Sequence, residues 1–238
     1  MFGHISSYKY YKVVLYFVIS ILIFSGVLLY LSYERSRTIY FSQINTFQDL
    51  SELKFSLYQD QIATLVKKFH DGKKLDLNGT IEREVYKAVQ SFSQYDYLTN
   101  SYIDIPTSTM RGKDRFTHAI VVGETLLKQN VTFGYEYIMR PQLWKARDLA
   151  EQGEAAISDV YVDAYGKWLT IFVPIKDEDG NILAIHGLDL NVNIIEDNLR
   201  QQLLLDIVLV FLLIVLGTAC LIFVLNRIRV EEKKKLQE

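Results

Sequence analysis

The sequence predicts an α+β fold, an antiparallel sheet with a long N-terminal helix, flanked by two transmembrane helices. Three observations predict it. Two uncharged, apolar runs of 19 residues, at positions 13–31 and 207–225, stand near the ends of the 238-residue chain. Between them, apolar residues first recur at helical spacing, and short segments rich in β-branched and aromatic residues then follow, as in strands. The chain is therefore expected to hold one outer domain between two membrane anchors.

The two apolar runs are long enough to cross a membrane. Nineteen residues at ~1.5 Å each make a helix of roughly 28 Å, close to the ~30 Å of the hydrocarbon core. The first run lacks the small-residue cleavage site of a signal peptide, so we expect an uncleaved anchor. Lys9 and Lys12 precede the first run, and five Lys or Arg residues follow the second. This distribution predicts that both termini are cytoplasmic.

The expected organisation has five parts: a cytoplasmic N-terminal tail (1–12), transmembrane helix 1 (13–31), an extracellular domain (32–206), transmembrane helix 2 (207–225) and a cytoplasmic connector (226–238) without an output domain. The chain carries −2 overall and each tail carries +2, which leaves −6 for residues 13–225. An acidic outer domain is expected to bind nucleic acid poorly. The single cysteine, Cys220, lies in the second run, so the outer domain is not a disulfide scaffold.

Two helices are expected at the start of the outer domain. Residues 38–70 contain no glycine or proline, and their apolar residues recur every three to five positions. This long helix is expected to grow out of the first span and to end at the turn "HDGKK". A shorter helix is expected over residues 81–92, after the turn "LDLNGT". The apolar stripe of the long helix comprises Ile44, Phe47, Leu50, Leu53, Leu57, Ile62, Leu65 and Phe69.

Six later segments predict strands of an antiparallel sheet. Asp179-Gly180, between the last two segments, is a hairpin signal, so those strands are expected to be neighbours. The segment "LWKARDLAEQGE" has helical character and interrupts the strands. The six segments are "YLTNSYIDI", "FTHAIVVGE", "VTFGYEYIM", "DVYVDAY", "KWLTIFVPI" and "NILAIHGLDL".

Residues 135–192 carry an ordered set of short motifs. An Arg-Pro with a nearby aromatic residue, a "Y-x-D", a "PI-x-D-x-x-G" hairpin and a glycine-then-Asp strand end follow one another. This order resembles the Cache (extracellular PAS-like) sensor domains of bacterial transmembrane receptors, such as methyl-accepting chemotaxis proteins and sensor histidine kinases. The resemblance implies a PAS-like sheet and a sensory role for the domain between the two spans.

The resemblance also implies a set of ligand-binding residues. In family members that bind amino acids, the arginine and the aromatic residue of "R-x-x-W" hold the carboxylate, and acidic residues on later strands hold the ammonium. Here "RPQLW" has one more residue between Arg and Trp. Tyr135, on a predicted strand, is a further candidate as a polar-tipped pocket wall. By position, the implied ligand-binding residues are Arg140, Trp144, Tyr161, Asp163 and Asp189.

The chemistry of arginine supports the assignment of Arg140. A guanidinium stays charged when it is desolvated and offers paired donors that match a carboxylate. Pro141 fixes the chain beside Arg140 and biases that residue toward an extended backbone. The alternative for Arg140 is an ion pair with a neighbour such as Asp163, and the alternative for Trp144 is a place in the core.

Strand alternation bears on Asp189. It places this residue on the same side as Ile185 and Gly187, the concave side of the sheet, and His186 on the opposite side. The alternatives are that Asp189 caps the following turn and that Asp163 is a turn residue.

No metal or catalytic site is predicted. His118 and His186 lack a paired ligand spacing, so we expect each to be packed or hydrogen-bonded. The sequence has no Gly-x-Ser-x-Gly elbow and no glycine-rich phosphate loop before a helix, and no cofactor is expected. A membrane-anchored extracellular hydrolase is the remote alternative. Any kinase or cyclase output would lie outside this chain.

The expected function is that of a ligand-sensing input module of a bacterial transmembrane receptor. A chemoreceptor is favoured, and the sensor part of a histidine kinase or nucleotide cyclase is the alternative. The expected partners are a small carboxylate-bearing ligand (an amino acid or organic acid), membrane lipid and a cytoplasmic signalling output. The apolar stripe of the long helix predicts packing both on the domain's own sheet and on a second copy in a homodimer, with the membrane-proximal end of the helix as the dimeric part.

Overall fold

The computed structural model describes residues 3–95, 98–163 and 166–235, which separate into two compact units. One unit is the domain Phe41–Glu196, and the other combines Met1–Tyr40 with Asp197–Glu238. Tyr97 and residues 164–165, at the ends of two predicted strands, lie outside the described residues, as do the two extreme ends of the chain.

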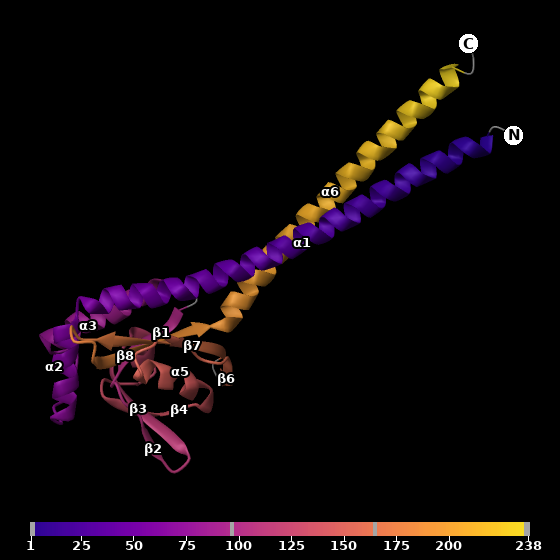
Figure 1. The fold of residues 1–238 in the computed structure, drawn as a ribbon. Helices are drawn as coiled ribbons and strands as arrows, with labels where there is room; N and C mark the ends of the chain where they lie inside the picture. The colour runs from indigo at the N-terminus through magenta and orange to yellow at the C-terminus, as the bar shows by residue number, and fades with distance from the viewer. Residues whose placement is uncertain (1–2, 96–97, 164–165, 236–238) are drawn as a thin grey trace. The chain divides into compact units, whose positions relative to one another are not determined.

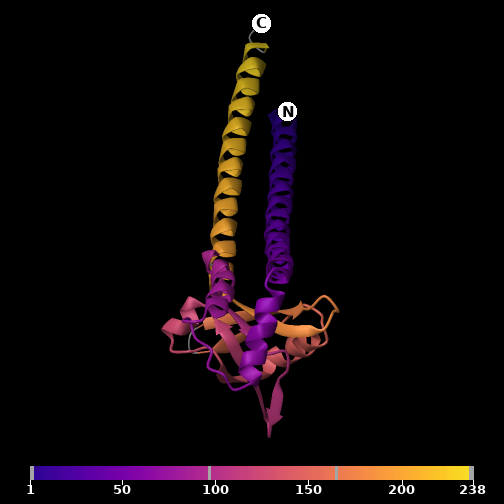
Figure 2. The same cartoon turned by 90° about the vertical axis from the view of Figure 1, so that its left-hand side faces the viewer.

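The second unit contains two helices that are long and apolar enough to cross a membrane. They belong to α1 (Gly3–Ser56) and α6 (Val192–Lys235), drawn toward the indigo and yellow ends of the chain in Figure 1. Figure 2 shows the two helices running alongside each other. Gly217 on α6 permits a close approach, because a Cβ there would lie 3.3 Å from Ile21 on α1.

The domain is built on an antiparallel sheet that has eight strands within the described residues. The order is β2-β3-β1-β8-β7-β5, with β4 paired to β3 and β6 paired to β7, so β1 and β8 are central neighbours. The predicted α+β fold, an antiparallel sheet with a long N-terminal helix, is confirmed; β2 and β5 are not among the predicted strands. The strands are β1 (Leu98–Asp104), β2 (Thr109–Arg111), β3 (Asp114–Val122), β4 (Tyr135–Met139), β5 (Ala156–Ile157), β6 (Tyr161–Asp163), β7 (Gly166–Lys176) and β8 (Ile182–Asn191).

The β7–β8 hairpin forms at the Asp-Gly turn that predicts it. The backbone N–H of Asn181 donates to Asp177 Oδ1 at 2.7 Å, and Gly180 has a φ of 84°, which glycine adopts without strain. The turn sets a register in which Thr170 lies opposite Asp189. The hairpin thereby places a hydroxyl beside the carboxylate.

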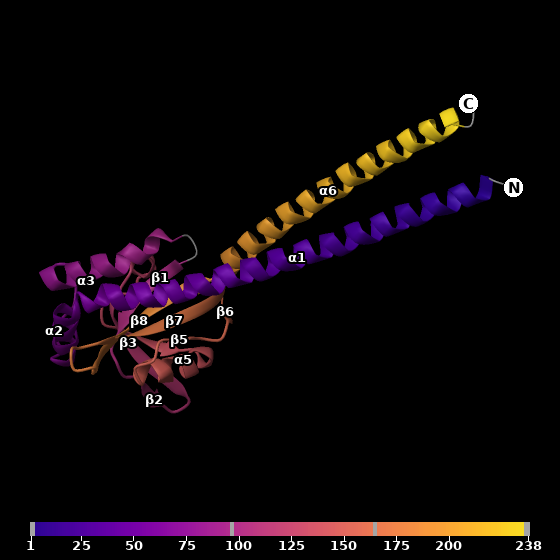
Figure 3. The same ribbon diagram turned by 45° about the horizontal axis from the view of Figure 1, so that its top comes forward.

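Helices cover both faces of the sheet. Figure 3 shows α1 and α3 over one face and α5 over the other. The 3₁₀ helix η1 follows α3 directly. The bounds are α2 (Gln59–His70), α3 (Thr80–Gln90), η1 (Ser91–Gln94), α4 (Glu124–Lys128) and α5 (Pro141–Glu151).

The single helix predicted over residues 38–70 is wrong, because it breaks after α1. The N–H groups of Leu57 and Tyr58 donate to carbonyls three residues back, at 3.2 and 3.1 Å, which tightens the chain into a turn. Helix α2 then leaves in a new direction (Figure 1). The turn allows Phe55 before it and Ile62 after it both to be fully buried.

The predicted apolar stripe of α1 also divides into two faces. Of the predicted stripe, Ile44 and Phe47 are buried, whereas Leu53 and Leu57 are 68% and 74% exposed; Phe55, which is outside the predicted stripe, is also buried. The buried residues recur at helical spacing, and Leu53 lies about half a turn away from Phe55. The domain's own sheet therefore covers one face of this helix, whereas Leu53 on the helix and Leu57 in the turn after it stay uncovered within one copy of the domain.

His186 joins the helical layer to the centre of the sheet. Its Nδ1 hydrogen-bonds Ser51 of α1 at 2.6 Å, and its Nε2 hydrogen-bonds Ser101 of β1 at 2.9 Å. Its ring makes an edge contact with Phe55, with centroids 4.5 Å apart. Burial lowers the pKa of His186 from 6.5 to about 3, so this imidazole is neutral. The expectation that His186 is packed and hydrogen-bonded is confirmed.

We predict that His186 makes the fold acid-sensitive. The unfolded chain binds a proton at this residue below about pH 6.5, and the folded chain does not until about pH 3. Stability should therefore fall with decreasing pH in this window, by up to about 1.4 kcal/mol per pH unit from this residue. Denaturation of the full chain in detergent micelles across this range should show a shallower slope for His186→Gln than for the wild type. Equal slopes would contradict the prediction.

Candidate functional site

A cavity of about 230 Å³ opens on the face of the sheet that carries α5. Pockets for drug-sized ligands are typically ~300–1,000 Å³, so this one suits a smaller molecule. One part of its lining is aliphatic and the other is polar. The aliphatic residues are Ala119, Leu126, Val131, Ile138 and Leu143, and the polar ones are Tyr102, Tyr135, Tyr137, Arg140, Tyr161, Asp163 and Asp189.

Five of the six predicted site residues line this cavity, and Trp144 does not. Its indole N–H donates to the carbonyl of Met139 at 3.0 Å, and its ring packs against the buried cluster under α5. The additional residue between Arg and Trp explains the difference, because one residue turns a helical side chain by about 100°. Trp144 is therefore a core aromatic, as its alternative assignment predicts.

Arg140 stands at the N-cap of α5, immediately before Pro141. Its backbone is extended, with φ −65° and ψ 145°, as the following proline favours. The guanidinium lies over the ring of Tyr161, 5.7 Å from its centroid, and its Nη2 is 3.6 Å from Asp163 Oδ2. Because 49% of the side chain remains exposed, Arg140 is available to a ligand in addition to its ion pair with Asp163.

Asp189 is buried and surrounded by uncharged donors. Its Oδ1 accepts hydrogen bonds from Thr170 at 2.7 Å and Tyr102 at 3.3 Å, and its Oδ2 accepts one from Asn100 at 3.1 Å. Burial raises its pKa. Asp189 lines the cavity on the side that strand alternation predicts. The cap of the following helix is instead Asn191, whose side chain accepts the N–H of residue 193.

Asp163 is a turn residue that also lines the cavity. Its Oδ1 accepts hydrogen bonds from the indole N–H of Trp168 at 2.8 Å and from the N–H of Gly166 at 3.1 Å, as a turn residue does. Its Oδ2 faces Arg140. The carboxylate is thus fixed on one side and lines the cavity together with the guanidinium.

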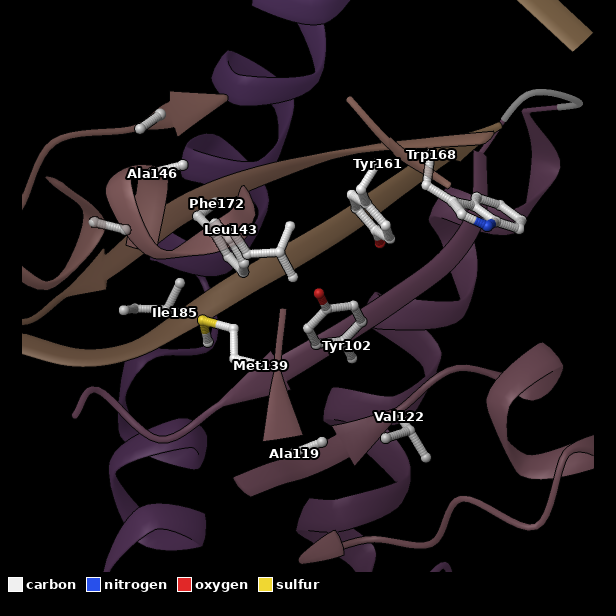
Figure 4. Close-up of a cluster of buried hydrophobic side chains, with 12 residues drawn as sticks. Tyr102, Ala119, Val122, Met139, Leu143, Ala146, Tyr161, Trp168, Phe172 and Ile185 are labelled. Atoms are coloured by element: carbon white, nitrogen blue, oxygen red, sulfur yellow. The ribbon is translucent and has the colours of Figure 1, made fainter. Parts of the chain in front are cut away.

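Tyr102 fits against Gly187, its partner across β1 and β8. A Cβ on Gly187 would lie 2.3 Å from the Tyr102 ring, so only glycine leaves room for this ring. Figure 4 shows the hydroxyls of Tyr102 and Tyr161 pointing toward each other within the buried cluster. The glycine before Asp189 therefore positions a tyrosine that holds that carboxylate.

Sequence reasoning missed the buried ion pair of Arg147 and Asp104. Both side chains are 0% exposed, and Arg147 Nη1 lies 2.7 Å from Asp104 Oδ2. Arg147 also donates to the carbonyl of Ile105 at 2.6 Å and to Glu151 at 2.9 Å. The cavity residue Tyr137 donates its hydroxyl to the same Asp104 oxygen at 2.7 Å. Only the Arg–Glu spacing of four residues along the helix gave a local signal of this network.

The described residues contain no group of three or more His, Cys, Asp or Glu side chains arranged to hold a metal. Asp163 and Asp189 are instead bonded by the N–H and O–H donors named above.

Comparison with known proteins gives one sequence relative and several solved structures. No protein-family model matches the sequence. A segment of 85 residues, 35% of this chain, is 32% identical to a probable methyl-accepting chemotaxis protein of Bacillus thuringiensis subsp. konkukian and spans only 15% of that protein.

Solved structures with a similar fold include the sensory domain of the Campylobacter jejuni chemoreceptor Tlp3. The two chains are 14% identical with a TM-score of 0.39, and the match covers 77% of this chain and 65% of that one. The E. coli DcuS sensor domain is also similar, with 14% identity and a TM-score of 0.33. This match covers 61% of this chain and 97% of that one. Both of these solved structures are sensor domains.

We predict that Gly187→Ala displaces Tyr102 and destabilises the domain. The added methyl group overlaps the tyrosine ring, and overpacking of this kind costs about 1–3 kcal/mol. Thermal denaturation of the full chain in detergent would measure the loss. Combining Gly187→Ala with Tyr102→Leu, which shortens the facing side chain, should recover part of the stability. If the double variant were as unstable as the sum of the two single changes, the proposed contact would not be the cause.

Proposed function

We propose that this chain is the ligand-sensing input module of a bacterial transmembrane receptor, with a chemoreceptor as the favoured class. The observation that carries the proposal is a cavity lined by one guanidinium, Arg140, and two carboxylates, Asp163 and Asp189. The sequence match to a chemotaxis protein supports the choice of class. A histidine kinase or nucleotide cyclase is the alternative output, and it would reside outside this chain.

The charges around the cavity favour a small zwitterion. Arg140 and Asp163 balance each other at 3.6 Å, whereas Asp189 is bonded only by uncharged donors and leaves one excess negative charge. An ammonium group beside Asp189 would offset this charge, and the rings of Tyr102 and Tyr161 would favour it further. The half-exposed guanidinium of Arg140 would then receive the carboxylate.

The rest of the lining indicates the remainder of the ligand. Ala119, Leu126 and Val131 form an aliphatic part of the wall, where a branched aliphatic side chain would be buried. The volume of about 230 Å³ limits that side chain to a few carbons. We therefore propose a small aliphatic amino acid as the ligand.

The chain path supports a route for the signal. In the proposed topology both termini are cytoplasmic, the domain is extracellular, and α1 and α6 cross the membrane. Asp189 lies on β8, which ends at Asn191, and α6 begins at Val192 without an intervening loop. A ligand that prefers one position of β8 would therefore act directly on the helix that enters the membrane. A coupling energy of ~1–3 kcal/mol is typical of such links.

Three probes that share the isobutyl side chain of leucine and differ in their charged groups test the recognition scheme. L-leucine carries both charged groups, 3-methylbutan-1-amine lacks the carboxylate, and 4-methylpentanoate lacks the ammonium. Calorimetric titration of the full chain in nanodiscs should show the tightest binding for L-leucine. Arg140→Gln should weaken L-leucine roughly tenfold or more and leave the amine unchanged, because a lost charged hydrogen bond is worth about 1.5–3 kcal/mol.

Asp189→Asn should have the opposite selectivity. It should weaken L-leucine and the amine and leave 4-methylpentanoate unchanged. Lys145→Gln, on an exposed position of the same helix as Arg140 and outside the cavity lining, is the matched control. Binding of L-leucine that neither cavity variant alters would refute the recognition scheme, and a failure of all three probes would refute the proposed ligand class.

The proposed module is a homodimer. Leu53 near the end of α1 and Leu57 in the turn after it are 68% and 74% exposed, and they offer an apolar contact for the same residues of a second copy. In a Cys220→Ser background, Leu53→Cys should form a disulfide-linked dimer under mild oxidation in membranes. Glu84→Cys, exposed on α3, is the control and should stay monomeric. Equal cross-linking at both positions would indicate random collision.

A further inference from the structure

Asp104 is a buried carboxylate behind the cavity wall, and its two oxygens have different surroundings. Oδ2 accepts hydrogen bonds from Tyr137 and Arg147, both at 2.7 Å. Oδ1 is buried and has no hydrogen-bond partner within the described part of the chain. A proton could therefore occupy Oδ1 without breaking either existing bond.

Asp104 is linked to the cavity through two tyrosines. Tyr137 lines the cavity and donates its hydroxyl to Asp104. Tyr102, two residues before Asp104 on β1, lines the cavity and donates to Asp189. The two rings are in edge contact, with centroids 6.4 Å apart. Asp104 and Asp189 are thus two buried carboxyl groups on either side of one aromatic wall.

We propose that Asp104 is a proton-linked positioning residue for the cavity. While ionised, it fixes the Tyr137 hydroxyl and α5 and adds to the negative potential that attracts a ligand ammonium at Asp189. When it takes up a proton, that attraction weakens. The ligand part of this inference rests on the proposed function, because it takes the ammonium to lie beside Asp189.

Charged and titratable groups face Asp104 from every element packed against it. Arg147 is the one positive charge in direct contact with it among the described residues, and Asp189 opposes that charge from across the aromatic wall. The groups are Arg147 and Glu151 on α5, Tyr137 on β4, Tyr102 on β1, Asp189 on β8 and, through Glu151, Arg115 on β3.

The pKa of Asp104 agrees with its buried position and with its Oδ1, which has no partner among the described residues. Burial raises the pKa of Asp104 from 3.8 to about 6, and the charge of Asp189 acts in the same direction. Between these two pH values the folded chain holds a proton that the unfolded chain has released. The contribution of Asp104 to the free energy of unfolding therefore grows as the pH falls through this window, while the cavity loses one negative charge.

We predict that the titration of Asp104 responds to its two neighbours. The ¹³Cγ shift of labelled Asp104, assigned with Asp104→Asn, should titrate with a midpoint near pH 6 in the full chain in detergent micelles. Asp189→Asn should lower the midpoint by on the order of 0.5–1 pH unit, because a like charge is removed. Tyr137→Phe should raise it by a similar amount, because the ionised form loses a donor.

Asp189→Asn is a mild change at this site. Thr170 and Tyr102 can still donate to its oxygen, and the buried Oδ1 of Asn100, which has no partner among the described residues, can accept its new amide after a flip. A midpoint that is the same in the wild type, Asp189→Asn and Tyr137→Phe, or no titration between about pH 4 and 8, would overturn the inference.

L-leucine separates this inference from the proposed function. It should lower the Asp104 midpoint in the wild type and have no effect in Asp189→Asn. Shifts in the two variants without any effect of L-leucine would support the coupling of Asp104 to the cavity wall and count against the proposed ligand. Binding of L-leucine with an invariant Asp104 would count against the coupling alone.

Discussion

The pairing of β1 with β8 is the constraint on which the rest of the domain depends. Residues opposite each other on these central strands share a face of the sheet, so Tyr102 and Gly187 lie on the cavity side, and His186 lies on the helical side. A slip of one residue would exchange the faces and send Asp189 into the apolar layer under α1. The fit of Tyr102 against Gly187 fixes the register of β1 and β8, and the Asp-Gly hairpin joins β8 to β7 on its other side.

The same face of the sheet carries two buried carboxylates with different counter-charges. An unpaired buried charge is costly, so each one needs donors. Asp104 forms an ion pair with Arg147, a cation of the chain itself. Among the described residues, Asp189 accepts hydrogen bonds from a hydroxyl, a phenol and an amide, and none of these donors is charged. The difference separates a charge that the chain itself neutralises from one that a bound cation would neutralise.

Sequence patterns predicted the parts of this architecture that depend on local signals. Strand periodicity and the Asp-Gly turn predicted β7 and β8 and the face of Asp189, and Arg-Pro predicted an extended Arg140.

The remainder of the architecture depends on contacts between distant segments. Arg147 resembles any solvated charge on a surface helix, and only the buried Asp104 across the sheet gives it a role. No glycine or proline marks the break of the helix after Ser56. The break instead allows both Phe55 and Ile62 to be buried, which is a tertiary contact that the local sequence does not show. The rotation of Trp144 follows from where α5 begins.

The positions of the two proposed ligand contacts, Arg140 and Asp189, suggest how a small molecule would act on the membrane helix of the proposed receptor. Arg140 is the N-cap of α5, and Arg147 ties α5 to Asp104 at the centre of the sheet, so this anchor belongs to the rigid part of the domain. Asp189 lies on β8, three residues before α6 begins. A ligand that joins the two would draw the last strand toward a fixed point. The free energy for this movement would come from the buried charge of Asp189, which is unfavourable in the empty cavity and relieved in the occupied one.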